Sequence, residues 1–223
     1  MNDSNGVSSL FSIRGKIALV TGGSRGIGLM IARGCVEAGA TVYITSRTAE
    51  VCDAVAEELS TVGRCISLPN DLSTMEGVEN LVREISEREE ELHILVNNAG
   101  AAWGEPIETF PEEGFDKITD LNLKSLFFLT RDLLPMLEKA GSSEDPARVI
   151  NIGSIDGLRV PFVPNFSYAA AKAAVHHLTR MLAVHLGGRK ITVNAVAPGF
   201  FPSKMTRHLL ENYRETFEKA CPL

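Results

Sequence analysis

Six short apolar runs rich in Val and Ile alternate with longer segments of helical periodicity from residue 16 onward, and this alternation limits the fold more than any other feature. The runs are almost continuously apolar, as are strands of a parallel sheet covered on both faces. We therefore predict strands at residues 16–21, 41–46, 64–68, 92–97, 148–153 and 191–196. The intervening periodicity predicts helices at residues 27–38, 49–62, 74–90, 112–139 and 166–186. Pro135 falls inside the fourth of these segments, so we expect a kink or an early stop there. Such a pattern indicates an α/β fold with a doubly wound parallel sheet.

No linker, repeat or low-complexity tract divides the chain, so we predict a single Rossmann-like domain over residues 1–223, with residues 1–14 as a polar N-terminal extension. The first ten residues lack the features of a signal peptide, and no run approaches the ~18 apolar residues of a membrane helix. We therefore expect a cytoplasmic protein without a membrane span. The formal net charge of −6 argues against nucleic acid as a partner. The spacing of the four cysteines favours free thiols, and we expect no metal site.

A glycine-rich loop follows the first predicted strand, and it leads directly into a helix. Its sequence, Thr21-Gly22-Gly23-Ser24-Arg25-Gly26-Ile27-Gly28, lets the backbone approach a pyrophosphate at the helix N-terminus. The spacing differs from the general dinucleotide fingerprint, and a plain turn that needs glycine only for positive φ is the alternative. Its place between the first strand and the first helix favours cofactor binding by Gly22, Ser24, Arg25, Gly26, Ile27 and Gly28.

The end of the second predicted strand indicates which dinucleotide is bound. An NAD-binding protein places an acidic residue here for the ribose 2′-hydroxyl, whereas this chain has Ser46-Arg47. A carboxylate would repel a 2′-phosphate, whereas Arg47, helped by Arg25, offers it a planar fork of donors. We therefore expect NADP(H); the alternative is that Arg47 is a solvated loop charge.

Tyr168 is the only tyrosine with a lysine four residues on, and a helix places Tyr168 and Lys172 on one face. A nearby ammonium lowers the pKa of a phenol and makes it a usable acid or base near neutral pH. Ser154 ends the fifth predicted strand and Asn98 follows the fourth, so both lie at the edge where open α/β sheets bind ligands. His176, His177 and His185 share the helix with Tyr168, but adjacent histidines point about 100° apart and form a poor chelating pair.

Together with Asn122 and Pro198-Gly199, these motifs resemble, in their order along nearly the whole chain, the short-chain dehydrogenase/reductase family. The resemblance implies that Tyr168 is the general acid/base and that Lys172 lowers its pKa and binds the nicotinamide ribose. It also implies that Ser154 orients the substrate carbonyl and that Asn122 holds a proton-relay water near Lys172.

The resemblance further implies cofactor contacts from the segments after the third, fourth and sixth predicted strands: Asp71 and Leu72 beside the adenine, Asn98, Ala99 and Gly100 along the adenosine half, Pro198 and Gly199 near the nicotinamide, and Ser203, which stands where the family often has Thr.

Within the family, the sequence is most similar to bacterial NADPH-dependent 3-oxoacyl reductases of the kind linked to rhamnolipid synthesis. We therefore expect an NADP-dependent ketoreductase, with specificity from Trp103, residues 155–166 and residues 200–207, and a substrate that is a small ketone or a carrier-bound acyl chain. Gluconate 5-dehydrogenase-like enzymes are also similar, so a polyol or sugar dehydrogenase remains an alternative. The resemblance implies a homodimer or homotetramer.

Family members usually continue into a further helix and a last edge strand, and this chain stops at Leu223. We therefore expect a shortened form or a fragment whose sheet lacks that strand. A non-catalytic cofactor-binding subunit is the alternative that this expectation supports.

Overall fold

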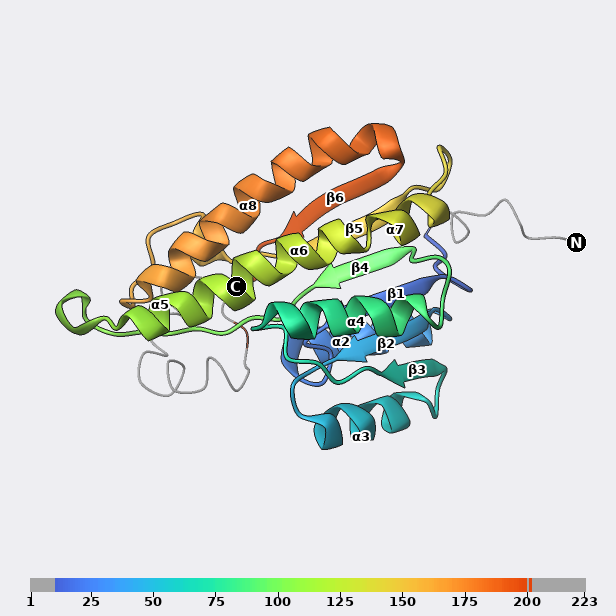
Figure 1. Cartoon of the computed structure of the whole chain (residues 1–223), viewed down its shortest axis with the longest axis horizontal. Coiled ribbons are helices and arrows are strands. Elements are labelled where there is room, and N and C mark those ends of the chain that lie inside the picture. Colours follow the sequence, from blue (N-terminus) through green and yellow to red (C-terminus); the bar gives the residue numbers. More distant parts are fainter. Residues whose placement is uncertain (1–10, 200, 202–223) are drawn as a thin grey trace, which may run out of the picture.

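The computed structural model describes residues 11–199 and residue 201. Within them lies a parallel sheet of six strands: β1 (Ile17–Thr21), β2 (Thr41–Thr45), β3 (Arg64–Ser67), β4 (Ile94–Asn97), β5 (Ala147–Ile152) and β6 (Ile191–Val196). The strand order is β3-β2-β1-β4-β5-β6 (Figure 1). It reverses between β1 and β4, and such a switch point is where open α/β sheets bind their ligands. The predicted fold class is confirmed, and each predicted strand matches an observed one to within two residues at either end.

Helices flank the sheet, and helical turns join several of them. The helices are α2 (Gly26–Glu37), α3 (Ala49–Leu59), α4 (Met75–Ser86), α5 (Glu112–Thr119), α6 (Ser125–Asp132), α7 (Leu134–Ala140) and α8 (Phe166–Leu186). The turns are the 3₁₀ segments η1 (Ile107–Thr109), η3 (Ile155–Gly157) and η4 (Gly187–Arg189), and the π-helical segment η2 (Asp120–Lys124).

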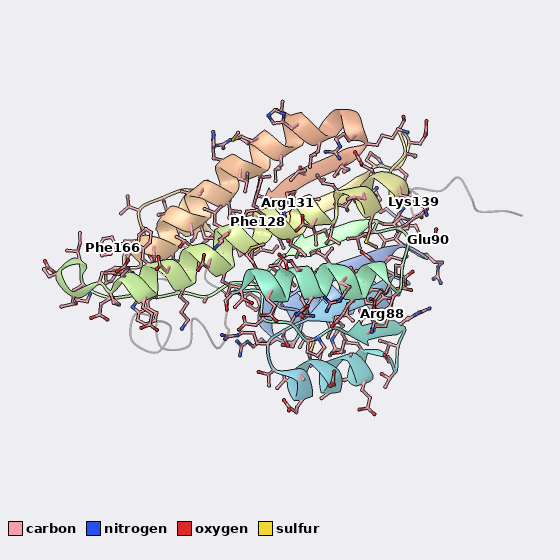
Figure 2. The ribbon with its side chains drawn as sticks, viewed as in Figure 1. Arg88, Glu90, Phe128, Arg131, Lys139 and Phe166 are labelled. Atoms are coloured by element: carbon pink, nitrogen blue, oxygen red, sulfur yellow. The ribbon has the colours of Figure 1, made fainter. Side chains whose placement is uncertain are left out.

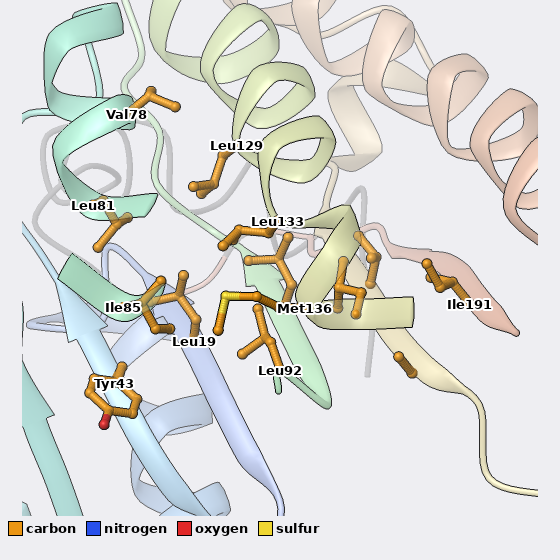
Figure 3. Packing of buried hydrophobic residues seen from close by; sticks show 14 of the residues in the cluster. Leu19, Tyr43, Val78, Leu81, Ile85, Leu92, Leu129, Leu133, Met136 and Ile191 are labelled. Atoms are coloured by element: carbon orange, nitrogen blue, oxygen red, sulfur yellow. The ribbon is translucent and has the colours of Figure 1, made fainter. Parts of the chain in front are cut away.

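The sheet carries one hydrophobic cluster on each face, which explains why its strands are almost continuously apolar. Leu19 of β1 packs with Ile85 of α4 and Met136 of α7, and Figure 3 shows these side chains together. Ala18 and Val20, which point to the opposite face, pack with residues of α2 and α3. The prediction of a sheet covered on both sides is therefore confirmed.

The helical segment that we predicted over residues 112–139 is broken twice. The second break follows the prediction, because α6 ends at Asp132 and α7 begins at Leu134, with Pro135 in its first turn. Proline lacks the N–H that an interior helical position donates. The first break, the π-helical segment η2, was not predicted. In it the backbone N–H of Ser125 donates to the carbonyl of Asp120, five residues earlier.

A chain of buried polar side chains crosses the centre of the sheet. The Asn97 amide donates to Asn151 Oδ1 at 2.9 Å and to Thr130 Oγ1 at 3.0 Å. Asn151 in turn donates to Thr179 Oγ1 of α8 at 2.9 Å. Asn97 and Asn151 are also directly paired residues of β4 and β5. This network links two strands with two helices, α6 and α8, that pack on the same face of the sheet.

The two ends of the sheet differ in character. Figure 2 shows Phe166, at the start of α8, on the side of the molecule toward which the strands point, and Lys139 and Glu90 together on the opposite side, where they form an ion pair. Among residues 11–199 and 201, none of the helices combines the length and the apolar character that crossing a bilayer requires. The expectation that the sheet lacks a last edge strand concerns the chain after β6, where residue 200 and residues 202–223 lie outside the described part.

Candidate active site

The glycine-rich loop joins β1 to α2 in a conformation that depends on its glycines. Gly22 and Gly26 have positive φ angles of 65° and 56°. A Cβ on Gly28 would lie 2.3 Å from the Gly22 carbonyl oxygen, so no side chain fits there. The first turn of α2 has no side-chain cap, because Arg25 at the N-cap position makes no capping bond. The loop therefore leaves backbone N–H groups of a helix N-terminus available to an anion, as a pyrophosphate site requires.

Asn98 fixes this loop against the end of β4 at the switch point. Its side-chain amide donates to the carbonyls of Thr21 at 2.8 Å and Gly22 at 3.3 Å. The Thr21 hydroxyl accepts from the backbone N–H groups of Asn98 and Ala99, both at 2.9 Å. Asn98 and Ala99 therefore lie beside the glycine-rich loop, and their contacts with a cofactor stay a prediction.

The residues at the end of β2 fit the 2′-phosphate of NADP better than the ribose hydroxyls of NAD. Arg25 and Arg47 are both exposed, and neither forms an ion pair with a described acidic residue. The Ser46 and Thr45 hydroxyl oxygens are buried and have no hydrogen-bond partner in the described part of the chain. Cations and unused hydroxyls thus adjoin the place where an NAD site would carry a carboxylate, which fits the 2′-phosphate of NADP.

Asp71 and Leu72, predicted beside the adenine, are already engaged within the protein. Asp71 Oδ1 accepts from the backbone N–H of Ser73 at 3.0 Å and from its hydroxyl at 2.8 Å. The Leu72 side chain is buried in the hydrophobic cluster on the α4 face. A contact of Leu72 with a cofactor would therefore have to come from its backbone.

Tyr168, Lys172 and Ser154 converge at the carboxyl end of β5, as predicted. The Lys172 ammonium lies 5.8 Å from the centre of the Tyr168 ring and donates to the Ile152 carbonyl at 2.6 Å. Ser154 is buried, and its hydroxyl oxygen accepts from the backbone N–H of Asp156 at 3.1 Å. In that bond the Ser154 hydroxyl is the acceptor, so its hydrogen remains for another acceptor, either the Tyr168 phenol oxygen or a ligand.

Burial dominates the ionisation of this group. It lowers the pKa of the Lys172 ammonium to about 8. Burial also raises the pKa of the Tyr168 phenol, while the Ser154 side chain lowers it and the Asp156 carboxylate raises it. Loss of solvation thus disfavours the phenolate more than its neighbours favour it, and the predicted lowering of the Tyr168 pKa by Lys172 stays a prediction.

Asn122 lies in the π-helical segment η2 and is only 1% exposed. Its Oδ1 accepts from the backbone N–H of Ala101 and its Nδ2 donates to the carbonyl of the same residue, both at 2.9 Å. A Cβ on Gly100 would lie 3.2 Å from that Oδ1. Asn122 therefore pins the loop after β4, and its predicted role toward a water stays a prediction.

The segment after β6 reaches the same edge. The backbone N–H of Ile155 donates to the Pro198 carbonyl at 3.1 Å, which places Pro198 beside the Ser154 segment. A Cβ on Gly199 would lie 3.8 Å from the Ile155 side chain. Ser203 and the predicted specificity segment at residue 200 and residues 202–207 lie outside the described residues.

Two predicted specificity elements lie within the described chain. Trp103 is half-buried and packs on α5, where a Cβ on Gly114 would lie 2.8 Å from its ring and Lys117 lies 5.2 Å from the ring centre. The segment after Ser154 exposes apolar side chains: Leu158 is 64% exposed and Val160 is 89% exposed. These two residues follow Ser154 by four and six positions in the sequence.

Two residues at the site were missed from the sequence. Asp156 is buried beside Ser154 and Asn165, whose amide donates to Asp156 Oδ2 at 3.0 Å. His176 contacts the backbone of Ser154 and was considered only as a poor metal ligand. Its position, four residues after Lys172 and eight after Tyr168, was the available signal, because these spacings place all three side chains on one helix face. No group of three or more potential metal ligands occurs in residues 11–199 and 201.

Comparisons with known proteins agree with this geometry. The family model described as short chain dehydrogenase matches residues 16–214. The rhamnolipids biosynthesis 3-oxoacyl-[acyl-carrier-protein] reductase of Pseudomonas aeruginosa is 50% identical over 199 residues, which are 89% of this chain and 78% of that protein. The 3-oxoacyl-[acyl-carrier-protein] reductase FabG of the same organism is 38% identical over 213 residues, covering 95% of this chain and 84% of that protein.

Solved structures show the same similarity. The Pseudomonas aeruginosa RhlG/NADP active-site complex superposes with a TM-score of 0.88 at 49% identity, over 92% of this chain and 80% of that chain. A short-chain type dehydrogenase/reductase from Mycobacterium marinum gives a TM-score of 0.91 at 30% identity, over 98% of this chain and 85% of that chain.

Proposed function

This chain belongs to the short-chain dehydrogenase/reductase family, and from that premise we propose that it reduces the ketone of a 3-oxoacyl thioester to a secondary alcohol with NADPH. The observation that carries the proposal is the convergence of Tyr168, Lys172 and Ser154 at the carboxyl end of β5, the same edge of the sheet as the glycine-rich loop, in a chain 50% identical to a 3-oxoacyl reductase. When bound, NADPH supplies the hydride that the carbonyl carbon receives.

The protein residues supply orientation and a proton. We assign the Ser154 hydroxyl to the carbonyl oxygen, to which it donates its hydrogen. Tyr168 then protonates that oxygen as negative charge develops on it. Because burial raises the pKa of Tyr168, the phenol is protonated at neutral pH, as a reduction requires. We assign Lys172 to the electrostatic support of Tyr168 and to the ribose of the cofactor.

For the cofactor, we propose that the pyrophosphate lies on the first turn of α2 and that Arg47 and Arg25 bind the 2′-phosphate. Asp71, Leu72, Asn98, Ala99, Gly100, Pro198, Gly199 and Ser203 complete the proposed contacts. Asn122 supports them by holding Ala101.

The substrate and its partner follow from the exposed apolar segment after Ser154. We propose that an acyl chain lies along Leu158 and Val160, and that the chain is delivered on an acyl carrier protein, as the names of the two reductases imply for those enzymes. Arg159, 5.7 Å from the Phe162 ring centre, places a positive charge at this entrance. NADPH and carrier-bound acyl chains are both found in the cytoplasm, where we propose that the enzyme works as a homodimer or homotetramer.

Following NADPH absorbance with 3-oxoacyl thioesters, diketones and sugar ketones tests the proposal. We expect consumption with the thioesters and its loss in Tyr168→Phe by about 10²–10⁴-fold. Preference for sugar ketones would instead favour a gluconate 5-dehydrogenase-like activity. Cofactor binding without turnover on any ketone would overturn the enzymatic proposal.

A separate experiment tests the choice of cofactor. Charge-assisted bonds of ~1.5–3 kcal/mol each from Arg47 would favour NADPH over NADH by roughly tenfold to a few hundredfold. Arg47→Asp should therefore reverse the ratio of NADPH to NADH efficiencies, whereas the same change at Arg83, exposed on α4, should leave it unchanged. An unchanged ratio in Arg47→Asp would reject this role.

A further inference from the structure

His176 connects the helix of Tyr168 and Lys172 to the segment of Ser154. Its Nε2 lies 3.0 Å from the Ser154 carbonyl oxygen and 3.4 Å from the Ser154 backbone nitrogen. The shorter distance favours the tautomer in which Nε2 carries hydrogen and donates to the carbonyl. The same carbonyl also accepts from the backbone N–H of Gly157 at 3.1 Å. Ser154 is thus held from its own segment and from α8.

The residue before Ser154 is glycine because of this imidazole. A Cβ on Gly153 would lie 2.3 Å from Cε1, 2.6 Å from Nε2 and 3.1 Å from Nδ1 of His176, and these are its three nearest neighbours. Gly153 has no positive φ, so its backbone conformation does not itself require glycine. The His176 ring occupies the space that a side chain at position 153 would need.

Two further contacts hold the same segments together. Lys172 donates to the Ile152 carbonyl at 2.6 Å. A Cβ on Gly157 would lie 2.5 Å from the backbone of Lys172, so η3 packs directly on α8. Of the two α8 side chains in this set, Lys172 and His176, it is that of His176 which contacts Ser154 itself.

We propose that His176 is a positioning residue that sets the direction of the Ser154 hydroxyl relative to the Tyr168 phenol through the Ser154 peptide group. The inference rests on the proposed function, because it assigns Ser154 to the carbonyl of the substrate. A hydroxyl leaves the backbone in a direction that the peptide plane fixes, so loosening the Ser154 carbonyl moves the donor. A misplacement of ~1 Å at a reacting group can cost about 10²-fold in rate.

Variants at position 176 test the hydrogen bond. In glutamine the amide nitrogen lies about where Nε2 lies in histidine, whereas in asparagine it lies nearer Nδ1. We expect His176→Leu and His176→Asn to lower kcat by about 10–100-fold with NADPH affinity unchanged, and His176→Gln to keep most of kcat. His177→Leu, at the exposed neighbouring position, is the matched control and should not change kcat.

The pH profile separates positioning from proton transfer. Since Gln does not titrate, His176→Gln should keep the shape of the parent profile of kcat/KM. Loss of one limb of that profile would instead show that His176 is an acid or base, and equal activities of the Gln and Leu variants would overturn the hydrogen-bond role. Unchanged kcat in His176→Leu would overturn the inference altogether.

A readout that does not depend on turnover comes from the Gly153–His176 contact. Gly153→Ala should destabilise the folded protein, measured by urea unfolding, because the new methyl displaces the imidazole. In the His176→Ala background the same change should have little effect, since the ring is gone. Additive losses would refute the contact. An inactive parent enzyme would refute the proposed function, and the double-mutant cycle of Gly153→Ala and His176→Ala would then be the test of the inference.

Discussion

Replacing Lys172 by methionine should make the folded protein more stable while removing its activity. Lys172 is only 5% exposed, and burial lowers its pKa from 10.5 to about 8. At 1.36 kcal/mol per unit, keeping this ammonium charged in the folded state costs about 3 kcal/mol near neutral pH. Methionine keeps most of the side-chain length, but it leaves the Ile152 carbonyl without its donor, which costs ~1–3 kcal/mol. The net gain at pH 7 is therefore between zero and about 2 kcal/mol.

The dependence on pH is the sharper part of this prediction. Between the folded pKa of about 8 and the unfolded value of 10.5, the unfolded chain binds more protons than the folded protein, so the parent gains stability as the pH rises. The cost of the ammonium is fully present below pH 8 and is lost toward pH 10.5. The advantage of the methionine variant should accordingly shrink by about 2 kcal/mol between pH 7 and pH 9.5. The effect on the Ile152 carbonyl is the same at both pH values and cancels.

Urea unfolding of both proteins without cofactor, at the two pH values, measures this difference. Lys124→Met provides the control, because Lys124 is an exposed residue paired with Asp120 and should change stability by only ~0.3–0.5 kcal/mol. A stability difference between parent and Lys172→Met that does not vary with pH would refute the claim that a buried ammonium is kept at the expense of stability.

Three further changes have defined outcomes. Gly28→Ala places a methyl 2.3 Å from a carbonyl oxygen of the glycine-rich loop, so NADPH binding measured by fluorescence should weaken by more than about tenfold, a loss of ~1.4 kcal/mol; Gly34→Ala, on the same helix with nothing within 4 Å, should bind normally. Burial lowers the pKa of His93, whose Nδ1 accepts the backbone N–H of Ile17 in β1. The neutral His93 side chain therefore contributes to stability above pH 6.5, and this contribution is lost as the pH falls through the lower pKa of the folded state. His93→Asn keeps an acceptor at that position and should remove this acid-side loss in unfolding experiments; an unchanged pH dependence would contradict the assignment. Asp156→Asn removes a charge that raises the pKa of Tyr168, so the fall of kcat/KM at high pH should move to lower pH, and a shift upward would show that the carboxylate acts otherwise.

The sheet and the position of the site could be predicted because local signals determine them. The apolar runs marked all six strands, and the loop at residues 21–28 marked the first turn of α2. Pro135 marked the break before α7, since a proline without an N–H is itself the cause. These features need only the residues at the position concerned.

Features that depend on distant contacts could not be read in the same way. The π-helical segment accompanies the pairing of Asn122 with Ala101, 21 residues away, and nothing within residues 120–124 signals it. The sign of the pKa shift at Tyr168 depends on how deeply tertiary packing buries the phenol. His176 was set aside because it was considered beside His177, whereas its spacing from Lys172 was the informative one.

The chain of hydrogen-bonded side chains from Asn97 through Asn151 to Thr179 helps to select the register of the strands. Strands that are apolar on both faces can shift along one another by two residues and still bury their side chains, so hydrophobicity alone does not select one register. If β5 shifted along β4, the Asn97 and Asn151 amides would lose their hydrogen-bond partners in the apolar interior, at a cost of ~1–3 kcal/mol for each unpaired group. Asn98 follows β4 directly and Ser154 lies two residues after β5, so this buried amide network also sets the position of Ser154 relative to the glycine-rich loop that Asn98 holds.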